Sequence, residues 1–144
     1  MIDWNSKLGQ RTLARIESEQ VIWLTSVSPS GFPQPRPVWF VWDGSTFLIY
    51  TMPTAKKVMH ITKNPHVALH FNAGADGDDI QVILGNAAIA PDAPPSQQNS
   101  AYSAKYRAGI RSIGMTDESY STTFSMALRV LPTRLRGLEP LPAQ

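Results

Sequence analysis

The stretch VIWLTSVSPSGFPQPRPVWFVWDGSTFLIYT, residues 21–51, decides the fold class. It contains apolar or alternating runs at 21–27, 35–42 and 45–51, each of a length that suits a β-strand. The Gly/Pro-rich loop SPSGFPQ separates the first two runs, and Asp43-Gly44, a strong hairpin signal, separates the last two. Short consecutive strands joined by such turns predict antiparallel pairing.

The rest of the chain continues this pattern, with strand-like runs at 66–72, 79–90 and 124–138. Five or six strands with few helices predict a mainly β protein, built as an antiparallel sheet or barrel. Helices are expected at about 6–17, 54–63 and 99–112, with one or two further helical turns from Thr116. We expect one domain over residues 1–144, with an N-terminal helix over about 1–20 and a barrel with helical insertions over 21–138.

The composition excludes several classes of protein. The chain has 13 basic and 11 acidic residues, and a net charge of only +2 is not a nucleic-acid footprint. It has no cysteine, which excludes disulfides, thiolate catalysis and cysteine-ligated zinc. No apolar run approaches the roughly 18 residues of a membrane span. We therefore expect a soluble, cytoplasmic protein with neither nucleic-acid nor membrane partners.

The segment TMPTAKKVMHITKNP, residues 51–65, combines a short amphipathic helix with unusual charge placement. Thr54 is the expected N-cap, and Asn64-Pro65 is expected to end the helix. Lys56 and Lys57 then lie in the first turn, where the helix dipole makes cations unfavourable by roughly 0.3–1 kcal/mol. The bare amides of a helix N-terminus, a capping hydroxyl and two ammonium groups suit an anion such as phosphate. Solvated surface charge explains the pair equally well.

The run PRPVWFVW, residues 35–42, is apolar on both faces of the predicted strand. Pro35 and Pro37 cannot donate to a ladder, so the strand is expected to begin at an edge or rim of the sheet. One face then belongs to the core, and the other needs a helix, a partner subunit or a ligand to cover it. The alternatives at this stage are a core strand with a dimer interface, or a site for a planar heterocycle with a phosphate tail.

Other candidate sites are weak. His66 and His70 lie on one face of a strand but about 13 Å apart at ~3.3 Å per residue, which is too far for one metal ion. His60 has no metal-binding partner one turn away, and the aspartates at 76, 78 and 79 are expected at a hairpin tip. We expect no metal site. The chain also lacks a nucleophile elbow and the glycine-rich phosphate motifs, so no catalytic side chain is predicted.

The order of these motifs resembles the pyridoxamine 5′-phosphate oxidase-like split β-barrel family. It resembles in particular the actinobacterial branch of flavin- and deazaflavin-dependent oxidoreductases that uses coenzyme F420. The resemblance covers the strands of 21–51, AKKVMHITKNPHVALHF, DIQVILGNAAI, the segment 94–120 and FSMALRVLPTRLRG, and so essentially the whole chain. It implies a six-stranded antiparallel split barrel of the FMN-binding type, paired as a homodimer with two cofactor sites at the subunit interface.

The resemblance also implies a set of cofactor-binding residues. The ring would rest on the strand that contains Arg36, Pro37, Val38 and Trp39. The phosphate would be held by the end of the following strand and the start of the helix, at Tyr50, Thr51, Ala55, Lys56 and Lys57. Gln81 and Gly85 would complete the site together with residues of the partner subunit. The family commonly carries arginine at phosphate-facing positions, whereas this chain has a lysine pair, which binds phosphate as a point charge.

The activity implied is hydride transfer between F420 and a small unsaturated substrate of the enone or quinone type. The alternatives are an FMN-dependent oxidase of the pyridoxamine-phosphate-oxidase type, and a non-catalytic module that binds flavin, deazaflavin or haem.

Overall fold

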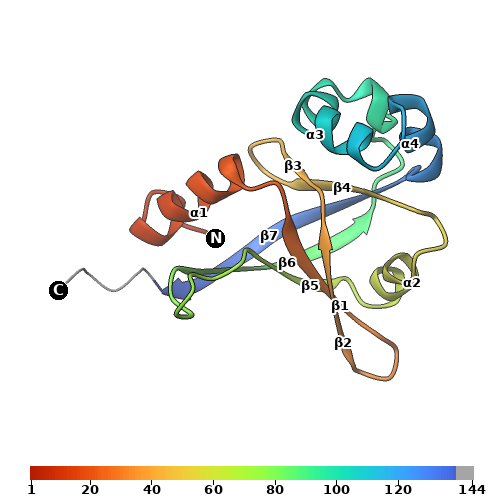
Figure 1. The fold of residues 1–144 in the computed structure, drawn as a ribbon. Coiled ribbons are helices and arrows are strands. Elements are labelled where there is room, and N and C mark those ends of the chain that lie inside the picture. Colours follow the sequence, from red (N-terminus) through yellow and green to blue (C-terminus); the bar gives the residue numbers. More distant parts are fainter. Residues whose placement is uncertain (139–144) are drawn as a thin grey trace.

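The computed structural model describes residues 1–138 as one curled antiparallel sheet flanked by helices (Figure 1). The strands are β1 (Ile22–Val27), β2 (Pro33–Val38), β3 (Val41–Trp42), β4 (Phe47–Thr51), β5 (His66–His70), β6 (Ile80–Ile89) and β7 (Met126–Leu138). The helices are α1 (Lys7–Ser18), α2 (Lys56–Lys63), the 3₁₀ turn η1 (Ser96–Gln98), α3 (Ser100–Ser112) and α4 (Asp117–Thr123).

The strand order explains why the barrel is split. The seven strands run in the order β2-β1-β5-β6-β7-β4-β3, so β2 and β3 lie at opposite ends of the sheet although they are consecutive in the chain. Only Trp39 and Phe40 connect them, which requires the sheet to curl until its two ends meet. β3 pairs only with Phe47 and Leu48 of β4. The remaining residues of β4 therefore have no strand beside them on that side, and they border the split, the gap between the two ends of the sheet.

The split-barrel fold expected from the sequence is therefore confirmed, with one difference in the strand count. The run 35–42 is not one strand, because the chain leaves β2 after Val38 and re-enters the sheet as β3 at Val41. The buried hydroxyl of Tyr106 bonds the main chain of Phe40 at this break, in place of a neighbouring strand.

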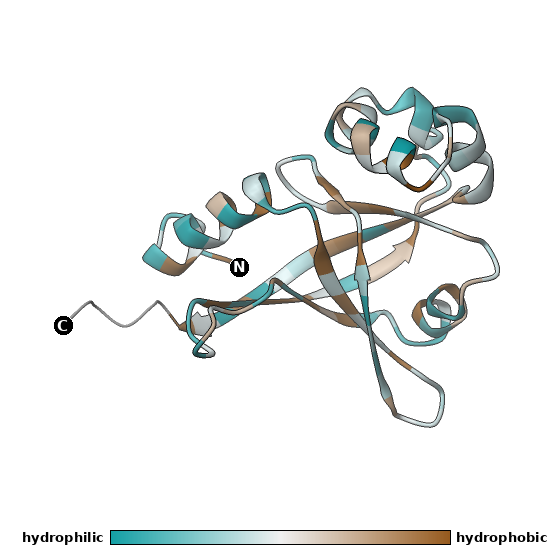
Figure 2. Cartoon of the chain, in the orientation of Figure 1, coloured by the Kyte–Doolittle hydropathy of each residue, from teal (hydrophilic) through white to brown (hydrophobic). Residues whose placement is uncertain are grey.

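The core lies in two places. The barrel interior is filled by inward-facing residues such as Leu24, Phe47, Leu69 and Ile83, each buried. A second cluster joins the outer side of β4 to α3 and α4 through Tyr50, Tyr102, Tyr106 and Tyr120, among others. Hydrophobic colour follows the barrel strands, whereas the exposed sides of the helices are hydrophilic (Figure 2). β4 is buried along its whole length because it lies between the two clusters.

Helix α2 differs from expectation at its start and agrees at its end. It begins at Lys56 with Ala55 as N-cap, and no side chain caps it, so the prediction that Thr54 is the N-cap was wrong. Thr54 is exposed instead. The Asn64 N–H donates to the His60 carbonyl, and the helix ends before Pro65 as predicted. The first turn of α2 therefore keeps its amides free of any side-chain cap.

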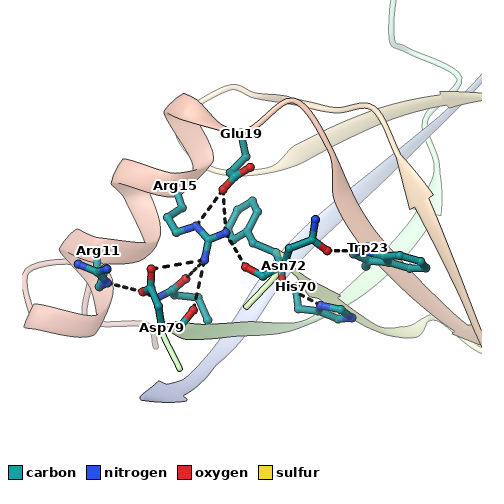
Figure 3. A network of polar contacts seen from close by, with 9 residues as sticks. Arg11, Arg15, Glu19, Trp23, His70, Asn72 and Asp79 are labelled. Atoms are coloured by element: carbon teal, nitrogen blue, oxygen red, sulfur yellow. Dashed lines mark hydrogen bonds and ion pairs between the residues drawn. The ribbon is translucent and has the colours of Figure 1, made fainter. Parts of the chain in front are cut away.

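Helix α1 is fixed to the barrel by a network around Arg15 (Figure 3). The Arg15 guanidinium donates to Glu19, to the main-chain oxygens of Asn72 and Asp79, and to the side chain of Gln81. Its five N–H groups are thereby all used. Arg11 also donates to the Asp79 carboxylate. The Arg11 bond, with a second bond from Gln81, lowers the pKa of Asp79 to about 2. Within residues 1–138 no helix has both the length and the hydropathy to cross a membrane.

Candidate functional site

A cavity of about 220 Å³ lies in the split, between the end of β2 and the end of β4. Its walls are mainly apolar, and the exceptions, Thr51 and Lys57, come from β4 and α2. The lining residues are Pro37, Val38, Trp39, Tyr50, Thr51, Lys57, Ile113, Tyr120 and Phe124. An apolar cavity with a cation in its wall suits a planar heterocycle.

Helices α3 and α4 supply one wall of this cavity. Trp39 stacks on Tyr106 with ring centroids 4.6 Å apart, and on Tyr120 at 5.6 Å. A Cβ atom added at Gly109 would lie 3.0 Å from the Trp39 ring, so a larger residue there would press against the indole. The Tyr120 hydroxyl lies 2.7 Å from that of Tyr102, which fixes the tyrosine against α3.

Helix α3 also fixes the main chain at the end of β2. The Tyr106 hydroxyl accepts from the Phe40 N–H at 2.8 Å, and it lies 2.9 Å from the Phe40 carbonyl. The Lys105 ammonium donates to the same carbonyl at 2.9 Å and lies 3.6 Å from the Phe40 ring centroid. Burial lowers the pKa of Lys105 to about 8. The position of Trp39 in the cavity wall therefore depends on contacts from another part of the chain.

A second cavity, of about 200 Å³, adjoins the first and is cationic. It is lined by Ser26, Gln34, Arg36, Ala55, Lys56, Lys57 and His60. Lys57 lines both cavities. The ion pairs among residues 1–138 involve only Arg11, Arg15 and Arg129 as cations, so no described carboxylate neutralises Arg36, Lys56 or Lys57. Uncompensated cations beside the uncapped first turn of α2 have the charge and the free amides that suit an anion.

Lys57 is the residue that joins the two cavities. It is half-buried, and its ammonium lies 3.4 Å from the Thr51 hydroxyl. Burial, and next the charge of Arg36, lower the pKa of Lys57. Both effects disfavour the charged form of Lys57 in the free protein. A bound anion would act in the opposite direction and favour the ammonium.

Nine of the eleven residues predicted for the site line these two cavities. They are Arg36, Pro37, Val38, Trp39, Tyr50, Thr51, Ala55, Lys56 and Lys57. Their role in binding a cofactor remains a prediction, but the structure brings them together. The sequence did not point to Ile113, Tyr120 and Phe124, which also line the ring-sized cavity.

Gln81 and Gly85 lie elsewhere in the protomer. Gln81 is buried, and its side chain accepts a bond from Arg15 and donates one to Asp79, so both ends of the amide have partners within the protomer. Gly85 lies at a bulge between β6 and β7, where an added Cβ would meet the Leu131 carbonyl oxygen at 2.6 Å. Within one protomer their residue types thus have structural explanations.

A sequence-family comparison agrees with this architecture. The family model described as pyridoxamine 5′-phosphate oxidase matches residues 8–133. The chain belongs to this family. No curated protein matches the sequence.

Solved structures of this family's fold include proteins with different names. A Listeria innocua protein described as a candidate pyridoxamine 5′-phosphate oxidase is 25% identical, with a TM-score of 0.68 over 90% of this chain and 97% of that one. A protein named F420 reductase is 22% identical, with a TM-score of 0.68 over 85% and 94% of the two chains. The haem storage protein HutZ of Vibrio cholerae is 13% identical, with a TM-score of 0.62 over 92% and 95%. The last two likenesses concern the fold alone.

The residues of the two cavities fit a phosphorylated planar ring. The first cavity offers apolar and aromatic surface, and the second offers three cations that lack carboxylate partners. Because Lys57 lines both, a ring in the first cavity could place a phosphate in the second without leaving the protein surface. Among the described residues, no group of three or more His, Asp or Glu side chains could hold a metal ion.

Proposed function

We propose that the protein is an oxidoreductase that transfers a hydride between coenzyme F420 and a small unsaturated substrate of the enone or quinone type. The observation that carries this proposal is the junction of an apolar, aromatic cavity with a cationic one at Lys57. The resemblance of the whole chain to F420-dependent family members supports the choice of deazaflavin. The family has oxidoreductase members, and a structure of the same fold is named F420 reductase.

The chain's own residues would bind and orient the cofactor. Trp39 and the end of β2 provide an apolar surface for the ring, and Tyr120 and Phe124 complete the apolar wall of the cavity. Lys57, Lys56 and Arg36 hold the phosphate as charge-assisted donors. When bound, a reduced deazaflavin supplies a hydride to an electron-poor carbon of the substrate. The protein contributes orientation and a dry cavity.

We assign no side chain as proton donor. Burial raises the pKa of Tyr50 and that of Tyr120, so both phenols hold their protons firmly. The Tyr50 hydroxyl also donates to the Pro94 carbonyl, and that of Tyr120 is bonded to Tyr102. The proton that follows the hydride would then come from solvent.

The proposal includes a homodimer in which a second copy covers the outer face of the sheet. The side chains on this face alternate with the core residues and are half-exposed on β1, β5 and β6. Trp23 pairs with His70 across β1 and β5, and Ala68 pairs with Leu84 across β5 and β6. Sedimentation velocity should report a dimer, and Leu84→Arg should give a monomer. A wild-type monomer at tens of micromolar would contradict this part.

Two other functions of the same site have specific support. The family's name favours an FMN-dependent oxidase. A fold relative named as a haem storage protein favours a non-catalytic module.

Fluorescence titrations of the wild-type protein with F420, FMN and haemin distinguish these functions. We expect F420 to bind most tightly, and reduced F420 to be oxidised, measured as recovery of its visible absorbance, on addition of an enone or quinone from a panel. FMN binding with oxygen consumption would favour the oxidase. Tight haemin binding without turnover would favour the storage module. Binding of none of the three ligands would refute the proposal and both alternatives.

A further inference from the structure

The edge strand β2 carries proline at every second position. In its pairing with β1, Pro33, Pro35 and Pro37 lie opposite Val27, Thr25 and Trp23. β2 has no second neighbour, because it ends the strand order. Prolines at an edge can leave the ladder intact only if they occupy the positions whose main-chain groups point away from the neighbouring strand.

The hairpin between β1 and β2 fixes this alternation. The Ser28 N–H donates to the Phe32 carbonyl at 2.9 Å, which makes Phe32 a residue that bonds toward β1. In an antiparallel pair every second residue does the same, so Gln34, Arg36 and Val38 also bond toward β1. The three prolines therefore turn their carbonyl groups toward the free edge. The main chain of β2 from residue 33 to residue 37 therefore presents carbonyl acceptors, and no main-chain N–H donor, at its free edge.

This donor-free edge reaches the ring-sized cavity at Pro37. Across the cavity the hairpin between β3 and β4 fixes the opposite pattern. The Asp43 N–H donates to the Thr46 carbonyl at 3.1 Å, so Thr46, Leu48 and Tyr50 turn their main-chain groups away from β7. The groups of Thr46 and Leu48 face the β3 side of the hairpin, and those of Tyr50, which lies beyond β3, face the split. The β4 side thus offers an N–H donor at Tyr50, and the β2 side offers none at Pro37.

We propose that position 5 of the bound ring faces the Pro37 carbonyl, and that Pro37 thereby makes this cavity select a ring that carries C–H, rather than a nitrogen acceptor, at its hydride-accepting position. The inference rests on the proposed function and names a determinant of cofactor choice. An oxidised flavin has a nitrogen lone pair at position 5, and a deazaflavin has a C–H group there. A strand edge with N–H donors can bond the nitrogen, whereas an edge of carbonyl groups repels it. Carbonyl oxygens form weak favourable contacts with C–H groups.

The test compares FMN with 5-deaza-FMN, which differ only at position 5 and carry the same phosphate. Equilibrium dissociation constants are measured by fluorescence titration for the wild type, Pro37→Ala and Pro33→Ala. Pro37→Ala restores an N–H at the cavity. Pro33→Ala restores one on the same edge but outside the cavity lining, and is the matched control. The ratio of the two constants cancels any general effect of a variant on the strand.

We expect the wild type to bind 5-deaza-FMN at least threefold more tightly than FMN. Pro37→Ala should shift this ratio toward FMN by roughly fivefold, the effect of one ordinary hydrogen bond. Pro33→Ala should leave the ratio unchanged. Equal wild-type affinity for the two rings would overturn the inference even if Pro37→Ala fails to fold. A ratio that Pro37→Ala leaves unchanged would overturn it too. Tight but indiscriminate binding would leave the proposed function standing, whereas binding of neither ring would refute both.

Discussion

The two ends of the barrel use cationic side chains in opposite ways. At the α1 end, the Arg15 guanidinium has a partner for every N–H, and Asp79 receives bonds from Arg11 and Gln81. At the split, Arg36, Lys56 and Lys57 have no carboxylate partner among residues 1–138. Removing a cation from a satisfied, buried network leaves its partners unpaired and destabilises the fold. An unsatisfied cluster costs free energy until an anion arrives, so the comparison separates a structural end from a binding end.

Loss of Arg15 should have the largest effect. Arg15→Ala leaves Gln81 and the carbonyls of Asn72 and Asp79 without their donor. Only 15% of the Arg15 side chain is exposed, so we expect the free energy of unfolding to fall by about 3 kcal/mol. Urea denaturation measures this change. Lys7→Ala, an exposed cation on the same helix, is the control and should change stability by less than about 0.5 kcal/mol. Equal effects of the two variants would mean that the network is not structural.

Loss of Lys57 should affect binding rather than stability. Lys57→Ala should weaken binding of the phosphorylated cofactor by roughly 1.5–3 kcal/mol, the scale of a charge-assisted hydrogen bond. Lys56→Ala should have a smaller effect because Lys56 is exposed. Fluorescence titration provides the measurement, and Lys63→Ala, in the last turn of the same helix, is the matched control. The assignment of the anion site fails if Lys57→Ala and Lys63→Ala bind the cofactor equally well.

Loss of the Tyr106 hydroxyl should affect both the stability of the fold and the affinity for the cofactor. Tyr106→Phe leaves the buried Phe40 N–H without its acceptor, so we expect the free energy of unfolding to fall by about 1–2 kcal/mol. Cofactor affinity should also fall, because Trp39 follows the main chain at Phe40. Thermal unfolding and titration on the same samples check the two effects. Thr12→Val, which removes a buried hydroxyl bonded within α1 and absent from the lining of both cavities, is the control for binding. Unchanged affinity in Tyr106→Phe would show that α3 does not set the cavity wall.

The smallest effect should be a pH dependence at the α1 end. The Arg11 bond is the main cause that lowers the pKa of Asp79 to about 2 from its usual value near 3.8. A lowered carboxyl pKa adds stability above the unfolded value, and this stability is lost as pH falls toward the folded value. The difference in unfolding free energy between wild type and Asp79→Asn should shrink from pH 4 to pH 2, by less than about 1 kcal/mol because Asp79 is partly exposed. A difference that grows in this range would contradict the account.

Most of the fold could be predicted because it follows local patterns. Alternation, the Asp43-Gly44 turn and the lysine pair at the start of α2 are all visible within short windows. The cavity wall from α3 and α4 could not be predicted from such windows. Tyr106 bonds Phe40 across 66 positions of the chain, and only the folded structure shows that Tyr120 and Phe124 face the split.

Gln81 is another residue whose contacts in the fold could not be predicted from its local sequence. The family resemblance implied that Gln81 helps to complete the cofactor site, and within the protomer its side chain accepts a hydrogen bond from Arg15, 66 positions away. The missing cap on α2 has a similar origin, since Ala55 takes the N-cap position that Thr54 favours by local preference. Nonlocal packing decided these points, and the sequence offers no short-range signal for them.

The most direct test of the central claim is a crystal structure of the protein with bound F420. We predict that the ring lies in the cavity lined by Pro37, Trp39 and Tyr120, and that the phosphate lies within hydrogen-bond distance of the Lys57 ammonium. A ring bound outside the split, or a phosphate with no contact to Lys57, would contradict the account.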